Sequence, residues 1–310
     1  MNKLIHPWQK EPIIFEKKTS NIKPKVTIVM PVFNQEKIID NILIQTCSSM
    51  GNPFKIVVID DASDDNSYSK ILNFFKFQSS ELRLLCSYVV IKNEFPIYET
   101  ACDNQGFRIA DTEFIIEIQS DIILKEKNFD VKMIKILDNH NIGTVSGRHL
   151  HPFALIDSHL SWLKYPFYKL QYLINSNYQC AGLIGNRIFS GNPVNTLQNF
   201  FCIGETNARG PWLLRKSDLI TLGYLDEENF FLGNDDHDYN RRIYKYLNKK
   251  AAYVNVNIQS IFETGSTRKI RTGVNLKIYN YLKKKKIGSN DFNTFLKNYK
   301  PYCKTEYVQI

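Results

Sequence analysis

The sequence predicts an α/β protein with a Rossmann-like central sheet that is mostly parallel and flanked by helices. Three observations support this fold class. Strand-like and helix-like segments alternate through the first half of the chain. The strand-like run over 54–59 is almost wholly apolar, which is typical of parallel strands that are covered on both faces. A length of 310 residues suits one large domain with an elaborated second half.

The first half supplies its elements in a regular order. A β-branched run over 25–32 predicts a strand that ends in a turn, and apolar residues at helical spacing predict a helix over 35–48. Repeated strand–helix units of this kind imply a parallel sheet with helices on both faces. After the strand over 54–59, helices are predicted over 66–77, 100–110 and 128–138, and strands over 84–91, 113–118 and 142–146.

The second half is less regular. It opens with a stretch rich in aromatic residues and Leu over 151–178, and its last part, from residue 271, is a Lys- and Tyr-rich tail that we expect to be helical. No clear linker interrupts the chain, so we expect one continuous domain over 25–270, with an N-terminal extension (1–24) and a basic C-terminal extension (271–310). Within the second half, strands are predicted over 212–215 and 251–258 and a helix over 235–247.

Composition narrows the classes of function. No secretory signal and no run of about 18 apolar residues is present, so we expect a cytoplasmic protein. The six cysteines form no CxxC pair, which favours reduced thiols over disulfides or zinc. Residues 241–310 hold sixteen Lys and Arg against three Asp and Glu. Such a basic end indicates an anionic partner (a nucleotide diphosphate, a membrane surface or a nucleic acid) or a solvated lysine-rich face.

Polar clusters follow three predicted strands and open one predicted helix. In open α/β sheets, ligands bind outside the carboxyl ends of the parallel strands. Each cluster alone has a structural explanation, because Asp and Ser also favour turns and helix N-termini. Together and in order, they indicate a binding site. The clusters are Pro31-Val-Phe-Asn34, Asp60-Asp-Ala-Ser-Asp-Asp65, Gln119-Ser-Asp121 and Gly233-Asn-Asp-Asp-His-Asp238.

This order of motifs resembles family 2 of the inverting glycosyltransferases, which have a GT-A-type fold. The resemblance covers residues 25–266, and its most specific part is Pro-x-aromatic-Asn-x-Glu after one strand and Asp-Asp-x-Ser after the next. It implies a transferase that moves a hexosyl or N-acetylhexosaminyl group from a nucleotide sugar with inversion. Residues 25–148 would then bind the nucleotide sugar, and residues 149–270 would form the acceptor side with the catalytic base.

The resemblance also implies roles on the donor side. Phe33 would line the nucleotide base together with Pro31. Asp61 would accept a hydrogen bond from the uracil ring N–H, which favours uridine over cytidine, while Asp60 would steady the turn. Asp121 would bind Mn²⁺ or Mg²⁺ between the two phosphates. The residues implied in donor binding are Pro31, Phe33, Asn34, Asp60, Asp61, Gln119, Ser120, Asp121 and Arg268.

By the same resemblance, the general base lies in the acidic motif that opens the helix over 235–247. Two registers remain open there. One alignment makes Asp236 the base, with Arg242 in the usual basic position, and the other gives the role to Asp235. We favour Asp236. The base would take a proton from an acceptor hydroxyl as its oxygen attacks the anomeric carbon.

Two departures from the family pattern concern the metal. The usual Asp-x-Asp motif is Gln119-Ser-Asp121, and no His follows His237. Arg268, Lys269 and Arg271 would neutralise part of the diphosphate, or they form a surface basic run. The departures also leave an alternative open, a glycosyltransferase-like protein that binds nucleotide sugar or glycan without turnover.

The acceptor is the least defined partner. Aromatic residues would stack on sugar rings or settle at a membrane interface. A helix with Lys283 to Lys286 beside four apolar or aromatic residues would lie on an anionic membrane, unless the lysines are only solvated. The four are Ile278, Tyr281, Leu282 and Ile287. We expect a saccharide acceptor, soluble or lipid-linked, peripheral membrane contact through the basic tail, and no nucleic acid, because the acidic motifs repel phosphates. The aromatic residues are Trp162, Tyr165, Phe167, Tyr168 and Tyr172.

Overall fold

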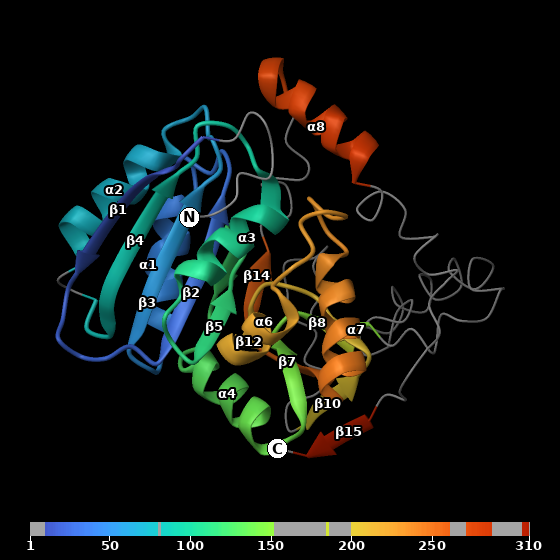
Figure 1. The fold of residues 1–310 in the computed structure, drawn as a ribbon. Coiled ribbons are helices and arrows are strands. Elements are labelled where there is room, and N and C mark those ends of the chain that lie inside the picture. The colour runs from blue at the N-terminus through green and yellow to red at the C-terminus, as the bar shows by residue number, and fades with distance from the viewer. Residues whose placement is uncertain are drawn as a thin grey trace, which may run out of the picture.

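A ten-stranded mixed sheet carries helices on both of its faces (Figure 1). The structure is a computed structural model that describes residues 10–79, 82–151, 184–185, 200–260, 271–286 and 306–309. In sheet order, the strands are β1 (Ile13–Lys18), β4 (Leu85–Lys92), β3 (Phe54–Asp60), β2 (Val26–Val32), β5 (Phe114–Glu117), β12 (Trp212–Arg215), β7 (Ile142–Ser146), β13 (Lys250–Val254), β10 (Phe200–Gly204) and β15 (Glu306–Gln309).

Two small sheets and the helices complete the described part. One small sheet has the order β11 (Thr206–Asn207), β8 (His149–His151) and β9 (Ile184–Gly185), and the other pairs β14 (Ile258–Ser260) with β6 (Ile122–Leu124). The helices are α1 (Ile39–Ser49), α2 (Ser67–Gln78), α3 (Tyr98–Ile109), α4 (Phe129–Asn139), α6 (Lys216–Leu222), α7 (Asp235–Leu247) and α8 (Gly273–Lys285).

The first half forms the parallel part of the sheet. β2 pairs in parallel with β3 and with β5, and β3 pairs in parallel with β4. All residues of β3 are buried, as expected of a strand that is covered on both faces. The α/β fold class predicted from alternating apolar runs is therefore confirmed.

The second half adds strands of mixed direction. β12 is antiparallel to both of its neighbours, β5 and β7, and β7 is parallel to β13. Because β12 reverses direction on both sides, β7 runs in the same direction as β5. The carboxyl ends of β2, β3, β5 and β7 therefore lie at one edge of the sheet, where the polar clusters of the sequence are found.

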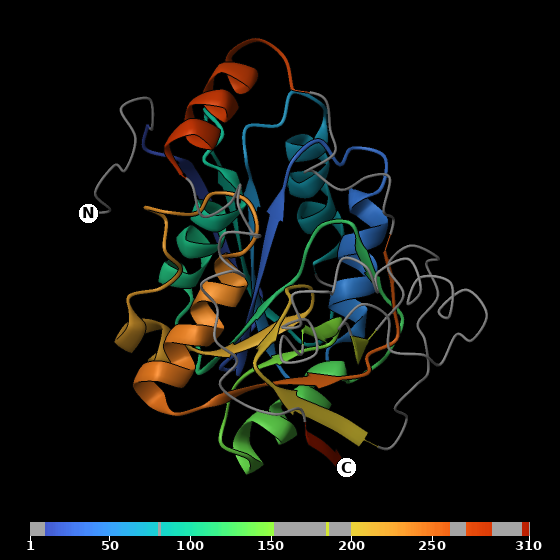
Figure 2. The ribbon, with the colours of Figure 1, turned by 90° about the vertical axis from the view of Figure 1, so that its right-hand side faces the viewer.

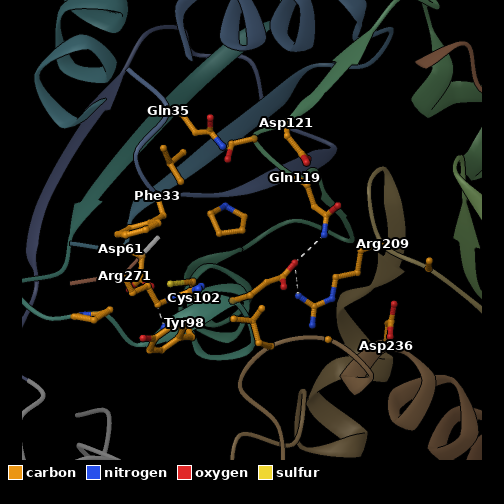
Figure 3. Close-up of a pocket in the computed structure, with 18 of the residues that line it drawn as sticks. Phe33, Gln35, Asp61, Tyr98, Cys102, Gln119, Asp121, Arg209, Asp236 and Arg271 are labelled. Atoms are coloured by element: carbon orange, nitrogen blue, oxygen red, sulfur yellow. Dashed lines mark hydrogen bonds and ion pairs between the residues drawn. The ribbon is translucent and has the colours of Figure 1, made fainter. Parts of the chain in front are cut away.

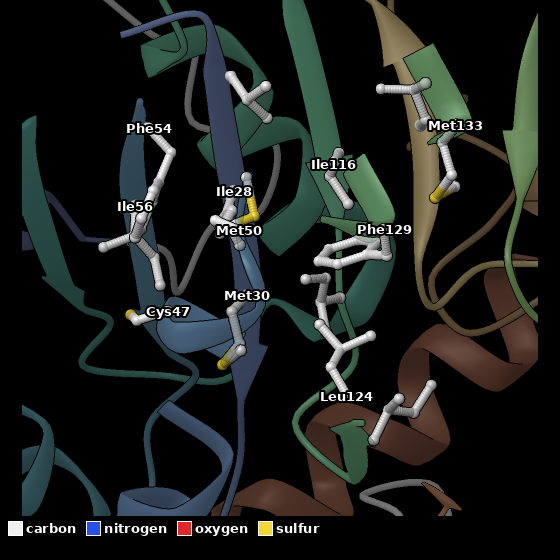
Figure 4. Packing of buried hydrophobic residues seen from close by; sticks show 14 of the residues in the cluster. Ile28, Met30, Cys47, Met50, Phe54, Ile56, Ile116, Leu124, Phe129 and Met133 are labelled. Atoms are coloured by element: carbon white, nitrogen blue, oxygen red, sulfur yellow. The ribbon is translucent and has the colours of Figure 1, made fainter. Parts of the chain in front are cut away.

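Alternating side chains of the sheet build two hydrophobic cores. Ile28 and Met30 of β2 share one core cluster with residues of α1, α2 and α4, whereas Val29 between them belongs to a second cluster with α3, α6 and α7. Figure 4 shows members of the first cluster from β2, α1 and α4. Figure 2 shows these layers from the side, with α1 and α3 on opposite faces of the sheet. A Cβ atom at Gly106 of α3 would stand 2.4 Å from Val29 Cγ1, so glycine permits this close approach.

Both predicted extensions contribute to the main sheet. β1 pairs antiparallel with β4, and β15 pairs antiparallel with β10. The boundary predicted at residue 25 thus falls between two strands of one sheet. The sequence did not predict β1, because its residues are exposed and lack an apolar alternation.

The predicted basic helix exists as α8, but its apolar side faces the protein. Ile278 and Leu282 are buried against Tyr98 and Phe231. From the sequence we expected these two residues to face a membrane. Lys286, predicted as a surface lysine, is buried and donates to the carbonyl oxygen of a loop residue. Within the described ranges, no helix has both the length and the apolar character needed to cross a bilayer.

Candidate active site

A cavity of about 270 Å³ lies at the edge where the parallel strands end (Figure 3). Loops after β2, β3, β5 and β7 form its walls, together with the starts of α3, α7 and α8. The four polar clusters of the sequence meet here. The predicted site residues that line the cavity are Pro31, Phe33, Asp61, Gln119, Ser120, Asp121 and Asp236.

Three predicted site residues lie behind the wall, and one lies outside the described residues. Asn34, Asp60 and Asp235 are absent from the residues that line the cavity. Arg268 falls in the segment 261–270, which the structure does not describe. The aromatic residues 162–172, which we expect on the acceptor side, also lie outside the described residues.

Asn34 and the acidic run after β3 hold two loops together. Ser63 Oγ accepts from the backbone N–H of Asn34 at 2.9 Å, and the side-chain Oδ1 of Asn34 accepts from the backbone N–H of Asp64 at 3.0 Å. Asp65 Oδ2 accepts from the Glu36 amide at 3.1 Å. The side chain of Asn34 therefore joins its loop to the loop after β3, and its role in donor binding stays a prediction.

Asp60 is fully buried and closes the turn at the end of β3. Its Oδ2 accepts from the Ser63 amide at 3.4 Å, and its Oδ1 has no hydrogen-bond partner among the described residues. Burial raises the pKa of the Asp60 carboxyl to about 6. This geometry fits the turn-steadying role that the sequence resemblance implies for Asp60.

Backbone donors hold Asp61 at one end of the cavity, which we call the nucleoside end after the role that the sequence resemblance implies for Asp61. Its Oδ1 accepts from the Ile97 amide at 2.8 Å and its Oδ2 from the Tyr98 amide at 2.9 Å. Burial raises the pKa of Asp61, while these donors act in the opposite direction. Tyr98 has a φ of 66°, a left-handed conformation that is rare for an aromatic residue and is commonly found at functional sites.

Aromatic and basic side chains surround the nucleoside end (Figure 3). Phe33 and Tyr98 line it, and the Tyr98 hydroxyl donates to the Asn275 carbonyl at 3.1 Å. The Arg271 guanidinium lies 5.5 Å from the centre of the Tyr98 ring and 4.6 Å from that of the Tyr279 ring. The start of α8 therefore forms part of the wall around this end.

Gln119 joins an acid and a base at the opposite end, which we call the charged end. Its Nε2 donates to Glu99 Oε1 at 2.7 Å, and its Oε1 accepts from Arg148 Nη1 at 2.7 Å. Asp121, two residues further on, is the strongest acidic influence on the pKa of Arg148, which burial lowers. The amide of Gln119 therefore occupies a place where a carboxylate would form an ion pair with Arg148.

Arg209 neutralises a group of carboxylates next to Gln119. It forms ion pairs with Asp103 of α3 and Asp235 of α7, and its Nη1 lies 3.3 Å from Glu99 Oε1. Asp103 and Asp235 are fully buried. Of the two neighbouring acids at the start of α7, Asp235 is thus bound to an arginine, and Asp236 forms part of the cavity wall.

The sequence prediction missed Glu99, Arg148 and Arg209. Arg148 follows the end of β7 at the same sheet edge, so the rule that located Asp61 and Asp121 would also have found it. Glu99 and Arg209 gave no such signal, because α3 and the loop before β12 come together only through the tertiary fold.

The residues around Asp121 do not by themselves form a site for a resident metal. In the described ranges, no group of three or more His, Cys, Asp or Glu is arranged to hold one. The oxygen of Gln119 is used by Arg148, whose guanidinium adds positive charge beside Asp121. Mn²⁺ or Mg²⁺ at Asp121 stays a prediction.

Comparisons with known proteins identify relatives. The model of the protein family described as "Glycosyl transferase family 2" matches residues 27–186, which is slightly more than half of the 310 residues. No curated protein matches the chain. Among solved structures, the mannosyltransferase PcManGT from Pyrobaculum calidifontis, in complex with GDP-Man and Mn²⁺, has a TM-score of 0.47 at 15% identity and covers 77% of this chain and 57% of its own.

Two further solved structures are similar. S. aureus TarS 1–349 in complex with UDP-GlcNAc has a TM-score of 0.47 at 14% identity, with 82% of this chain and 60% of that chain covered. GalNAc-T7 with UDP, GalNAc and Mn²⁺ has a TM-score of 0.49 at 12% identity, with 76% and 43% covered. This chain therefore spans about three fifths or less of the length of these three chains.

The family match begins in β2 and includes the loops after β2, β3, β5 and β7, each of which contributes to the cavity wall. The mixed sheet, parallel in its first half and flanked by helices on both faces, is the GT-A-type sheet predicted by the sequence. The chain belongs to glycosyl transferase family 2.

Proposed function

We propose that the protein transfers a sugar from a uridine diphosphate sugar to a hydroxyl group of a saccharide acceptor, with inversion at the anomeric carbon. One observation carries the proposal. A single cavity has a buried carboxylate and aromatic rings at its nucleoside end and Asp236 at its charged end. The family match over 27–186 supports the same class of reaction.

The nucleoside end is suited to uracil. Phe33 offers an aromatic surface to the base. Asp61 Oδ1 accepts from the Ile97 amide and from Asn93 Nδ2, whereas Oδ2 accepts from the Tyr98 amide and can accept one more hydrogen bond. Uracil has a ring N–H donor at this edge, whereas cytosine has an acceptor there. We therefore propose that Asp61 and Phe33 select uridine, with Pro31 and Ser120 completing the donor side.

Asp236 is the proposed general base. It lies at the cavity wall, while Asp235 behind it is paired with Arg209, which fixes the first turn of α7 against α3. A carboxylate in this position can take the proton from an acceptor hydroxyl as that oxygen attacks the anomeric carbon. A single displacement opposite the leaving diphosphate inverts the anomeric centre.

We propose a saccharide acceptor, soluble or lipid-linked, and a cytoplasmic enzyme. Lys283, Lys284 and Lys285 are exposed on α8 and would support weak contact with an anionic membrane.

A transfer assay with several uridine diphosphate sugars on a glycan array tests the proposal. We expect transfer from at least one donor, with the opposite anomeric configuration in the product. Tight binding of uridine diphosphate without any transfer would instead support a binding protein without turnover. Gln119, which replaces a carboxylate of the family motif, is the observation that favours this second candidate.

A further inference from the structure

Arg148 is a cavity-lining cation that forms no ion pair with the residues that the structure describes. The one hydrogen bond that its guanidinium makes with a described residue is from Nη1 to Gln119 Oε1 at 2.7 Å, and its buried Nε has no partner among those residues. Arg209, the neighbouring arginine of the same cavity, is paired with Asp103 and Asp235. An arginine keeps its positive charge at any accessible pH. Asp121 acts on this charge electrostatically, but no described carboxylate pairs with the Arg148 guanidinium as Asp103 and Asp235 pair with Arg209.

The position of Arg148 follows from the sheet. It comes two residues after β7, which runs in the same direction as β5, so it reaches the edge to which the loop after β5 brings Gln119 and Asp121. Gln119 then fixes its orientation. The Gln119 side chain is itself held in place, because its Nε2 donates to Glu99 Oε1 at 2.7 Å.

The neutral amide of Gln119 is what keeps this charge available. A carboxylate in its place would form an ion pair with Arg148 and cancel its charge towards a ligand. A glutamine orients the guanidinium by one hydrogen bond and leaves the remaining N–H groups for an anion. A guanidinium is well matched to phosphate oxygens, because its donors lie in a rigid plane.

We propose that Arg148, oriented by Gln119, binds the diphosphate of the donor and stabilises it as the leaving group. This inference rests on the proposed function and assigns the positive charge at the charged end to a side chain of this protein. Negative charge develops on the departing diphosphate as the bond to the anomeric carbon breaks, and a fixed cation in a partly water-excluded cavity stabilises that charge. Arg148 and Asp236 would then serve the leaving group and the attacking group, respectively.

The test is calorimetry with uridine, uridine diphosphate and inorganic pyrophosphate, all in the presence of a metal chelator. The wild-type protein should bind uridine diphosphate more tightly than uridine. Arg148→Gln should lower the affinities for uridine diphosphate and pyrophosphate by about ten- to hundredfold, as expected for lost hydrogen bonds to a charged group. The affinity for uridine should not change. Arg148→Lys, which retains the charge without the planar guanidinium donors, should lower these two affinities less than Arg148→Gln does.

Two further variants keep the test sharp. Gln119→Glu retains Arg148 but neutralises its charge with a new ion pair. The affinity for uridine diphosphate should therefore fall, while the affinity for uridine should not change. Arg83→Gln removes an exposed arginine just before β4, at the end of the strand opposite the cavity, and should change none of the three affinities.

The outcomes separate the inference from the function on which it rests. If uridine diphosphate gains affinity over uridine only when Mn²⁺ or Mg²⁺ is added, and Arg148→Gln leaves that gain intact, the inference is wrong. In that case uridine binding is retained and the proposed function stands. If uridine itself does not bind, the proposed function fails, and Arg148-dependent binding of pyrophosphate still decides whether the anion site exists.

Discussion

The nucleoside end and the charged end of the cavity are built in different ways. At the nucleoside end, Asp61 is fixed by the Ile97 and Tyr98 amides, so its position depends on one loop of the first half. At the charged end, Arg209 joins carboxylates of α3 and α7, and Gln119 joins Glu99 to Arg148. The charged end therefore exists only when both halves of the chain have come together.

This difference predicts which properties change together. A substitution at the nucleoside end should alter the affinity for the nucleotide and its base preference. A substitution at the charged end should alter transfer or diphosphate binding and leave recognition of the base intact. The predictions below test that separation, beginning with the largest effect.

The largest effect is expected for Asp236→Asn. An amide cannot accept the acceptor's proton, so transfer should fall on the order of a hundredfold to ten-thousandfold, while the affinity for uridine diphosphate stays close to wild type. Rates by product detection and affinities by calorimetry check this. Asp238→Asn is the matched control, because Asp238 pairs with Arg242 at 2.7 Å on the same helix and does not line the cavity. Full transfer activity in Asp236→Asn would rule out this base.

A smaller effect, on binding, is expected for Asp61→Asn. The amide keeps one acceptor oxygen and turns an NH₂ group towards the Ile97 or Tyr98 amide, which leaves a buried donor without a partner. We expect uridine diphosphate to bind about tenfold or more weakly, and the preference for uridine over cytidine to disappear. Asp64→Asn, at an exposed position in the same loop, should bind like wild type. An unchanged base preference in Asp61→Asn would contradict the proposed uracil contact.

The burial of Asp60 predicts a pH dependence of stability. Its pKa is raised from 3.8 to about 6, so the folded state holds this proton more tightly than the unfolded state. The stability that it contributes is fully present below about pH 3.8 and is lost as the pH rises through about 6. Asp60→Asn should lack this part of the decline, a difference on the order of 3 kcal/mol in unfolding free energy. Urea unfolding of both proteins between about pH 4 and pH 7 measures it. If the unfolding free energies of the two proteins changed with pH in the same way, the raised pKa of Asp60 would be contradicted.

The smallest effect is expected on the exposed face of α8. Replacing Lys283, Lys284 and Lys285 together by Gln should weaken sedimentation with anionic vesicles at low salt, by about 1 kcal/mol per lysine near the surface. The affinity for uridine diphosphate should not change, because none of the three lines the cavity. Wild-type protein that stays in solution at every salt concentration would remove membrane contact from the proposal.

The first half of the fold could be predicted because its signals are local. Apolar runs gave the positions of β2, β3, β4 and β5 to within about two residues, a precision that such patterns allow. The charged end could not be predicted in the same way. The sequence resemblance placed Gln119 among the donor-binding residues, and nothing near it in the chain indicates that Glu99 and Arg148 become its partners.

The helix α8 shows the same limit at the level of packing. Its apolar residues were predicted to face a membrane, because a helical pattern shows that a face is apolar but not what covers it. In the structure, Ile278 and Leu282 pack against Tyr98 and Phe231, which come from distant parts of the sequence. Only the exposed lysines remain available for the predicted role.

Calorimetric titration of the wild-type protein with uridine, cytidine, adenosine and guanosine diphosphates tests the central claim most directly. The claim is that this cavity binds a uridine nucleotide through Asp61 and Phe33. Uridine diphosphate should bind most tightly, and Phe33→Ala should weaken it while reducing the difference between the bases. Equal affinities for the four diphosphates, or tightest binding of one other than uridine diphosphate, would contradict the account.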